Sequence, residues 1–213
     1  MMANLISQVE YLLIRGMTKL LSLIRIIIVF RFLILKENSF ENFGSKGEKD
    51  GELNCPHAVV VDSNGNYFVS DTSNHRIQIF DENGVFIWKF GSHGTKKGEL
   101  SDPIGIGLLS NGNIVVSECK YDRISIFDSQ GNFIKIIEDG DLSKPMYLFI
   151  DLDDNVLVAD QCDQSIAIYS SETGELLKTV EVQSVIGLIY GITMDLNGRI
   201  IASGEKCVVV AIY

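Results

Sequence analysis

The sequence is poor in the residues that metal centres and disulfide frameworks require. Its 213 residues include only four cysteines and three histidines. Cys55, Cys119, Cys162 and Cys207 are widely separated and form no CxxC pair, which argues against a zinc ribbon and against a disulfide-rich scaffold. No Walker loop, nucleophile elbow or paired catalytic carboxylate pattern occurs either. We therefore expect no catalytic residue, metal or cofactor, and a reducing, cytoplasmic location.

Positive charge is scarce over most of the chain. The formal net charge is -10, and residues 1–39 carry five Lys or Arg and two Asp or Glu, a net charge of +3, so residues 40–213 carry -13. Neutralising a phosphate backbone requires clustered Lys and Arg. The acidic charge of residues 40–213 therefore favours a protein partner over RNA. We interpret the basic residues 1–39, called the leader below, as a separate segment.

The most informative feature that is present is a repeat. PHAVVVDSNGNYFVSDTSNHRIQIFD, from Pro56 to Asp81, matches PIGIGLLSNGNIVVSECKYDRISIFD, from Pro103 to Asp128, without a gap at a spacing of 47 residues. A third copy follows at a spacing of 42, from Pro145 to Ser170, and a fourth at 44, from Ile189 to Tyr213. The linkers repeat too, because FGSKGEKDGELNCP before the first copy is echoed by FGSHGTKKGELSDP before the second.

Each copy contains several short apolar segments separated by turn residues, which we read as four strands. Asn-Gly within SNGN, at 63–66 and again at 110–113, favours the tight turns of β-hairpins. A period in the forties with four strands per unit is typical of a β-propeller. The sequence therefore predicts an all-β propeller over residues 40–213, with about four four-stranded antiparallel blades at about 56–90, 103–137, 145–182 and 189–213.

At Asn74-His75-Arg76-Ile77 the sequence resembles the NHL repeat family, and the resemblance covers about residues 40–213. It is most similar to the NHL domains of tripartite-motif (TRIM-NHL) ubiquitin ligases. This resemblance implies an interaction module that recognises a protein partner within ubiquitin ligase pathways. The RING and B-box clusters of those ligases are absent from this sequence, so the chain itself is not expected to transfer ubiquitin.

Two other functions stay open under the same resemblance. One is an RNA-binding propeller, which the acidic charge disfavours. The other is a metal-dependent, lyase-like propeller enzyme, for which only His57, His75 and His93 could supply imidazole ligands. All three belong to the first full repeat or to the loop that follows it, and no further blade supplies another.

Propellers of this family have about six blades, and the ring closes with strands from both termini. About four blades therefore imply an incomplete ring with exposed blade edges, which soluble proteins avoid. We expect either that blades are missing or that a homodimer completes the ring.

An acid and an arginine recur in the loop between the second and third strands. Asp71 precedes Arg76, and Glu118 precedes Arg123 at the same spacing. A charge-assisted hydrogen bond between the two side chains would fix the loop that separates them. Because the motif recurs from blade to blade, we predict structural ion pairs rather than a single catalytic site.

The resemblance also implies where a partner binds. In NHL-like rings the relevant face is formed by the loop before the innermost strand and by the loop that carries the signature. The predicted binding residues are His57, Ile104, Met146 and Tyr190 at the channel mouth, and Asn74, His75, Tyr121, Asp122, Gln161 and Gln164 in the signature loops.

The basic leader, residues 1–39, has three interpretations. Its longest uninterrupted apolar run, from Ile26 to Phe30, lies between Arg25 and Arg31 and is short for a membrane span, which needs about 20 apolar residues. As a short apolar helix, residues 12–35 would instead form an interfacial, membrane-associated anchor. In the third interpretation RIIIVF, which begins at Arg25, is the degraded counterpart of RIQIF in a preceding blade.

Overall fold

The computed structural model describes residues 34–36, 39–41, 43–138, 140–182, 188–195, 197–204 and 208–211. In these residues the chain is all-β, as the repeat predicts, with one short 3₁₀-helix, η1 (Thr72–Asn74). The strands are β1 (Ile34–Lys36), β2 (Ser39–Glu41), β3 (Ser45–Lys46), β4 (Glu52–Leu53), β5 (Pro56–Val61), β6 (Tyr67–Asp71), β7 (Arg76–Phe80), β8 (Phe86–Phe90), β9 (Pro103–Leu108), β10 (Ile114–Glu118), β11 (Arg123–Phe127), β12 (Phe133–Ile137), β13 (Pro145–Ile150), β14 (Asn155–Asp160), β15 (Ser165–Ser170), β16 (Leu176–Glu181), β17 (Ile189–Met194), β18 (Ile200–Gly204) and β19 (Val208–Ala211).

The interpretations of the leader mostly concern residues 1–33, which lie outside the described residues. Strands β1 and β2 form a separate two-stranded sheet. No helix in the described part of the chain is long and apolar enough to cross a membrane.

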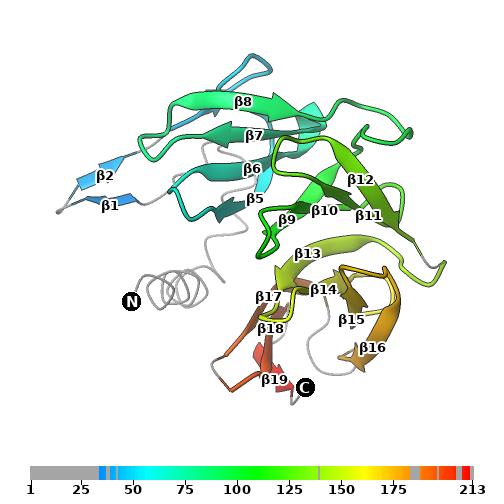
Figure 1. Cartoon of the computed structure of the whole chain (residues 1–213). Coiled ribbons are helices and arrows are strands. Elements are labelled where there is room, and N and C mark those ends of the chain that lie inside the picture. The colour runs from blue at the N-terminus through cyan, green and yellow to red at the C-terminus, as the bar shows by residue number, and fades with distance from the viewer. Residues whose placement is uncertain are drawn as a thin grey trace.

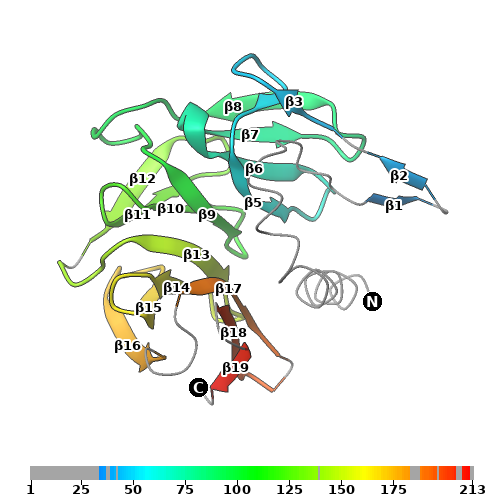
Figure 2. The ribbon, with the colours of Figure 1, turned by 180° about the vertical axis from the view of Figure 1, so that it is seen from behind.

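Each repeat forms one antiparallel sheet. β5–β8, β9–β12 and β13–β16 are four-stranded sheets, and β17–β19 is a three-stranded sheet. The first strands of successive sheets, β5, β9, β13 and β17, contact one another, so the sheets follow one another in an arc around these inner strands (Figures 1 and 2). These sheets are the blades of a β-propeller, about four as predicted, and within the described residues they do not close into a ring.

Polar residues set the hairpin turns between the first two strands of a blade. One carboxylate oxygen of Asp62 accepts hydrogen bonds from the backbone N–H groups of Asn64 and Asn66, each at 2.8 Å. Gly65 between them has a φ of 87°, a conformation that glycine adopts without strain. Asp151 makes the same pair of bonds in the third blade. The side chain of the aspartate thus fixes the register of the hairpin that follows it.

Apolar side chains fill the space between neighbouring sheets. One cluster includes Ile79 from the first blade and Ile114 from the second, and the next includes Val115 and Val156 from the second and third blades. Adjacent residues of β10 therefore pack against different neighbouring blades, and all five of its residues are buried. A strand that is covered on both faces reads as a continuous apolar run, which explains IVV in this strand.

Candidate functional site

The two kinds of loop that the sequence predicts as a binding face lie at the same end of each blade. Consecutive strands are antiparallel, so the loop before the inner strand and the loop between the second and third strands share one end. We call this end the signature face, formed in the first blade by residues 47–55 and 71–76. The opposite end, formed there by the turns at 62–66 and 81–85, is the turn face.

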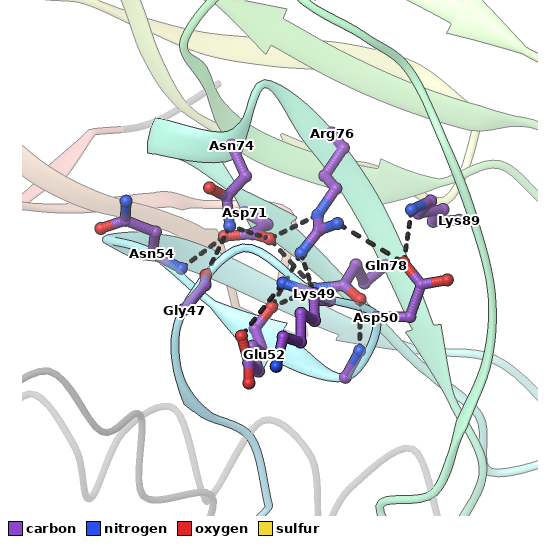
Figure 3. Close-up of polar contacts among 11 residues, drawn as sticks. Gly47, Lys49, Asp50, Glu52, Asn54, Asp71, Asn74, Arg76, Gln78 and Lys89 are labelled. Atoms are coloured by element: carbon purple, nitrogen blue, oxygen red, sulfur yellow. Dashed lines mark hydrogen bonds and ion pairs between the residues drawn. The ribbon is translucent and has the colours of Figure 1, made fainter.

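A buried ion pair is at the centre of the first signature loop (Figure 3). Arg76 Nε donates to Asp71 Oδ2 at 2.7 Å, and Asp71 is fully buried. The Asp71 carboxylate also accepts the backbone N–H of Asn54 (2.6 Å), Asn74 Nδ2 (2.9 Å) and Gln78 Nε2 (3.0 Å). Both carboxylate oxygens are therefore hydrogen-bonded, as a buried anion requires, and the pair fixes the loop between β6 and β7.

Arg76 also holds the linker that precedes the blade. Its Nη2 donates to the carbonyl oxygens of Lys49 at 2.8 Å and Glu52 at 2.9 Å, and its Nη1 lies 3.6 Å from Asp50 Oδ1. Gln78 Nε2 adds a bond of 2.6 Å to the Glu52 carbonyl. The guanidinium therefore clamps the linker onto the third strand of the blade.

The second blade repeats this clamp with glutamate in place of aspartate. Arg123 Nε and Nη2 each donate to one Glu118 carboxylate oxygen at 2.9 Å. Arg123 also donates to the linker carbonyls of Thr95 at 3.0 Å and Glu99 at 3.1 Å. In both blades the guanidinium thus joins the buried acid to the preceding linker, through one bond to Asp71 in the first blade and two bonds to Glu118 in the second.

The third blade keeps the buried acid but has lost the cation. Asp160 is 2% exposed and accepts the backbone N–H groups of Ser143 at 2.7 Å and Asp163 at 3.3 Å, while Ser165 occupies the position of the arginine. The repeat spacing falls here from 47 to 42, and the linker is the part that is five residues shorter. The arginine is therefore missing where the long linker is missing, which supports its role as a linker clamp.

Asp160 makes stability depend on pH. Burial raises the pKa of the Asp160 carboxyl, which the backbone bonds from Ser143 and Asp163 oppose. A carboxyl with a raised folded-state pKa contributes stability that is fully present below its unfolded pKa, about 3.9, and is lost as the pH rises through the folded value. Asp160→Asn should therefore raise the melting temperature, relative to the unchanged chain, more at pH 7 than at pH 4.

Asp128→Asn is the matched control with the opposite sign. The side-chain and backbone bonds from Asn132 lower the pKa of Asp128, so its contribution is present above the unfolded pKa and is lost as the pH falls. This variant should be less stable than the unchanged chain at pH 7, and the difference should shrink at pH 4. Thermal melts of the unchanged chain and both variants at pH 7 and pH 4 provide the comparison. A difference for Asp160→Asn that does not depend on pH would contradict a raised pKa of Asp160.

Non-glycine residues with positive φ recur at two places on the signature face, just before the inner strand and just before the third strand. They are Cys55 (49°), Asp102 (48°) and Lys144 (55°), and His75 (53°), Asp122 (49°) and Gln164 (50°). This conformation is strained for residues with side chains and persists only where the surroundings enforce it. Two backbone bonds do so between blades: Asp102 N–H donates to His75 Nδ1 at 3.1 Å, and Lys144 N–H donates to Asp122 Oδ1 at 2.7 Å. The signature loops of the first and second blades are thus each tied to the loop that enters the next blade.

The histidines of the signature face have local structural contacts. The rings of His75 and His93 pack with centroids 4.3 Å apart, and burial lowers the pKa of His75, with Asp102 opposing the shift. Nδ1 of His57 lies 2.8 Å from Thr72 Oγ1. Among the described residues, no group of three or more His, Cys, Asp or Glu side chains is gathered so that it could hold a metal ion.

The predicted binding residues share the signature end of the blades but differ in accessibility. Tyr121 and Tyr190 are 37% and 44% exposed, and Ile104 is buried. Asp122 is exposed as well, whereas His57, Asn74, His75, Met146, Gln161 and Gln164 are half-buried. Asn74 donates both to Asp71 and to the Gly47 carbonyl, so its amide is part of the loop structure. Tyr121, Asp122 and Tyr190 are thus the exposed members of the predicted set.

Sequence reasoning missed the serines that join one blade to the next. Ser70 Oγ donates at 2.7 Å to the carbonyl of Ile104 on the inner strand of the second blade. Ser117 Oγ donates in the same way to the carbonyl of Met146 on the inner strand of the third. Each serine directly precedes the acid of an ion pair, in VSD and VSE, so aligning the repeats would have exposed the signal.

Comparison with known protein families supports the repeat assignment. Residues 53–80 match the NHL repeat. Protein lin-41 of Caenorhabditis elegans is 51% identical over 47 residues, which cover 22% of this chain and 4% of the relative. E3 ubiquitin-protein ligase TRIM71 of Gallus gallus is 49% identical over 45 residues, which cover 21% and 5%. The matched segment therefore spans only a small part of these relatives' length.

Solved structures resemble most of the chain at low sequence identity. A streptogramin B lyase is 19% identical with a TM-score of 0.58, over 70% of this chain and 47% of that one. The WD40 beta propeller domain of Doa1 is 16% identical with a TM-score of 0.58, over 73% and 49%. At such identities the likeness shows the fold alone. The chain therefore has a β-propeller fold, carries an NHL repeat at residues 53–80, and is similar to TRIM-NHL proteins over about 45 residues.

Proposed function

We propose that the signature face of this propeller captures a partner protein. The observation that carries the proposal is the pair of exposed tyrosines at this end of the blades. Tyr121 lies in the signature loop that the Glu118–Arg123 pair and the bond from Lys144 to Asp122 hold, and Tyr190 lies on the inner strand β17 of the fourth blade. Tyrosine offers a large apolar ring with a polar hydroxyl and is enriched at protein interfaces. Loops that are already ordered lose little conformational entropy on binding, which favours affinity.

We further propose that the captured protein belongs to a ubiquitin ligase pathway. The support is the similarity, over about 45 residues, to E3 ubiquitin-protein ligase TRIM71 of Gallus gallus and to RING finger protein nhl-1 of Caenorhabditis elegans. The four widely spaced cysteines of this chain do not form a RING pattern. These residues would therefore supply recognition, and the transfer of ubiquitin would come from further sequence or from a partner.

The test replaces both tyrosines. Tyr121→Ala/Tyr190→Ala should reduce capture of a partner by about tenfold or more, because buried interface aromatics often dominate binding energy. The matched control is Val85→Ala, which removes an exposed apolar side chain from the turn face. Capture from RNase-treated extract, quantified by mass spectrometry and repeated with the purified partner, makes the comparison.

Two results would count against this proposal. Equal capture by the folded double-tyrosine variant would remove the signature face as the binding surface. Loss of capture on RNase treatment would indicate that RNA, rather than protein, is recognised directly.

A further inference from the structure

Two cavities on the turn face occupy equivalent places between neighbouring blades. The larger groove, about 630 Å³, lies between the second and third blades, and the smaller groove, about 380 Å³, lies between the first and second. Ile126 and Ile134 line the larger groove, and Ile79 and Ile87, at the corresponding positions one repeat earlier, line the smaller. The repeat thus generates a hollow with an aliphatic floor at each junction.

The rims of the two grooves differ in charge. They are formed by hairpin turns, and the third blade contributes acids where the second contributes neutral residues. Asp154 and Glu172 in the larger groove replace Gly112 and Gln130 of the smaller groove. Asp153 adds a third carboxylate to the larger groove, whereas the lining of the smaller groove includes one, Asp62. The larger groove therefore combines an apolar floor with an acidic rim.

Two of these three acids face solvent. Asp154 accepts the backbone N–H of Ser110 at 2.8 Å and also the Ser110 hydroxyl, so it bonds the second blade to the third. Lys135 is the cation in this lining, and its ammonium group donates a hydrogen bond to the backbone carbonyl oxygen of Glu172. Asp153 and Glu172 themselves are exposed. Their carboxylates are placed to meet positive charge arriving from outside.

Exposed aliphatic side chains accompany the acidic rim. Ile134 is 45% exposed on the floor of the larger groove. Leu152, next to Asp153 at the tip of its hairpin, is completely exposed, whereas the equivalent turn residues of the first two blades are Ser63 and Ser110. An apolar patch bordered by polar residues is typical of an interaction surface. The third blade therefore differs from the first two blades by features that are typical of an interaction surface.

We propose that the larger groove binds a basic, aliphatic segment of a partner protein. Its aliphatic side chains would pack on the exposed Ile134, and its Lys or Arg side chains would meet Asp153 and Glu172. Charge favours this occupant, because a basic segment is complementary to the exposed Asp153 and Glu172 carboxylates of the rim. This site is on the face opposite the signature loops and is independent of the function proposed for them.

The test uses the full chain and a fluorescein-labelled synthetic peptide of alternating leucine and lysine. Fluorescence anisotropy should show binding of this peptide and none of a matched peptide of alternating leucine and glutamate. Asp153→Asn/Glu172→Gln should weaken binding by about tenfold, because two rim charges are neutralised at once without loss of shape. Gln130→Ala, the corresponding change in the smaller groove, should leave binding unchanged.

The single tryptophan of the chain, Trp88, lines the smaller groove and reports separately on that site. Its emission should stay constant while the peptide binds. The proposal is overturned if the double variant binds equally well or if the Trp88 emission changes with the same midpoint as the anisotropy. A dimer that the peptide dissociates, detected by light scattering, would assign the groove to a second copy and would overturn the proposal as well.

Discussion

Replacing Arg76 with methionine is expected to lower the free energy of unfolding by about 3–5 kcal/mol, because the Asp71 carboxylate stays buried without its cation. Methionine retains much of the aliphatic stem, so the loss isolates the guanidinium and its bonds to the linker carbonyls. Urea denaturation gives this free energy directly. An unchanged midpoint would show that the buried pair does not hold the blade.

Arg199→Met is the matched control for this change. Arg199 pairs with Asp195 at 2.6 Å, but its side chain is 49% exposed, and exposed pairs contribute little to stability. The control should unfold close to the unchanged chain. Asp71→Asn combined with Arg76→Met should be less destabilised than the sum of the single variants, because the two side chains interact directly.

Gly105→Ala is expected to destabilise the fold by about 1–3 kcal/mol through overpacking. A Cβ at this position on β9 would lie 2.6 Å from the carbonyl oxygen of Met146 and 2.9 Å from the amide nitrogen of Leu148, both backbone atoms of β13. The inner strands of the second and third blades would have to separate, and thermal or urea unfolding measures the loss.

The repeat supplies the control for this second change as well. Gly191 holds the equivalent position in the fourth blade, and among the described residues a Cβ there would approach only the Ser203 hydroxyl, at 3.1 Å. Gly191→Ala should therefore be much milder. Equal effects of the two alanines would show that close approach of the inner strands does not limit residue size at Gly105.

Strand order and turn positions could be predicted because their signals are local and recur. Asn64-Gly65 marks a hairpin by itself, and its repetition one period later confirms the register. Only some of the contacts of Asp71 and Arg76 could be predicted from the sequence. Their mutual pairing follows from the loop between them, but the bonds to the Lys49 and Glu52 carbonyls depend on how the linker folds back.

Accessibility and cavities could not be read from the sequence. Ile104 occupies the same repeat position as Tyr190, yet the former is buried and the latter exposed. The difference depends on which neighbouring blade covers each residue, and local periodicity carries no such information. The grooves are formed by turns from two blades at once, so their charge emerges only when the blades are stacked. Whether the signature residues bind a partner stays a prediction.

The serine hydrogen bonds between blades imply that the junctions between neighbouring blades differ in mechanical strength. Ser70 and Ser117 each cross a junction with a hydrogen bond, but Ala159 holds that position in the third blade and has no hydroxyl to donate. The junction between the third and fourth blades is therefore held by packing of apolar side chains without this bond. Under tension or partial denaturation, we expect the described blades to separate first at the junction between the third and fourth blades.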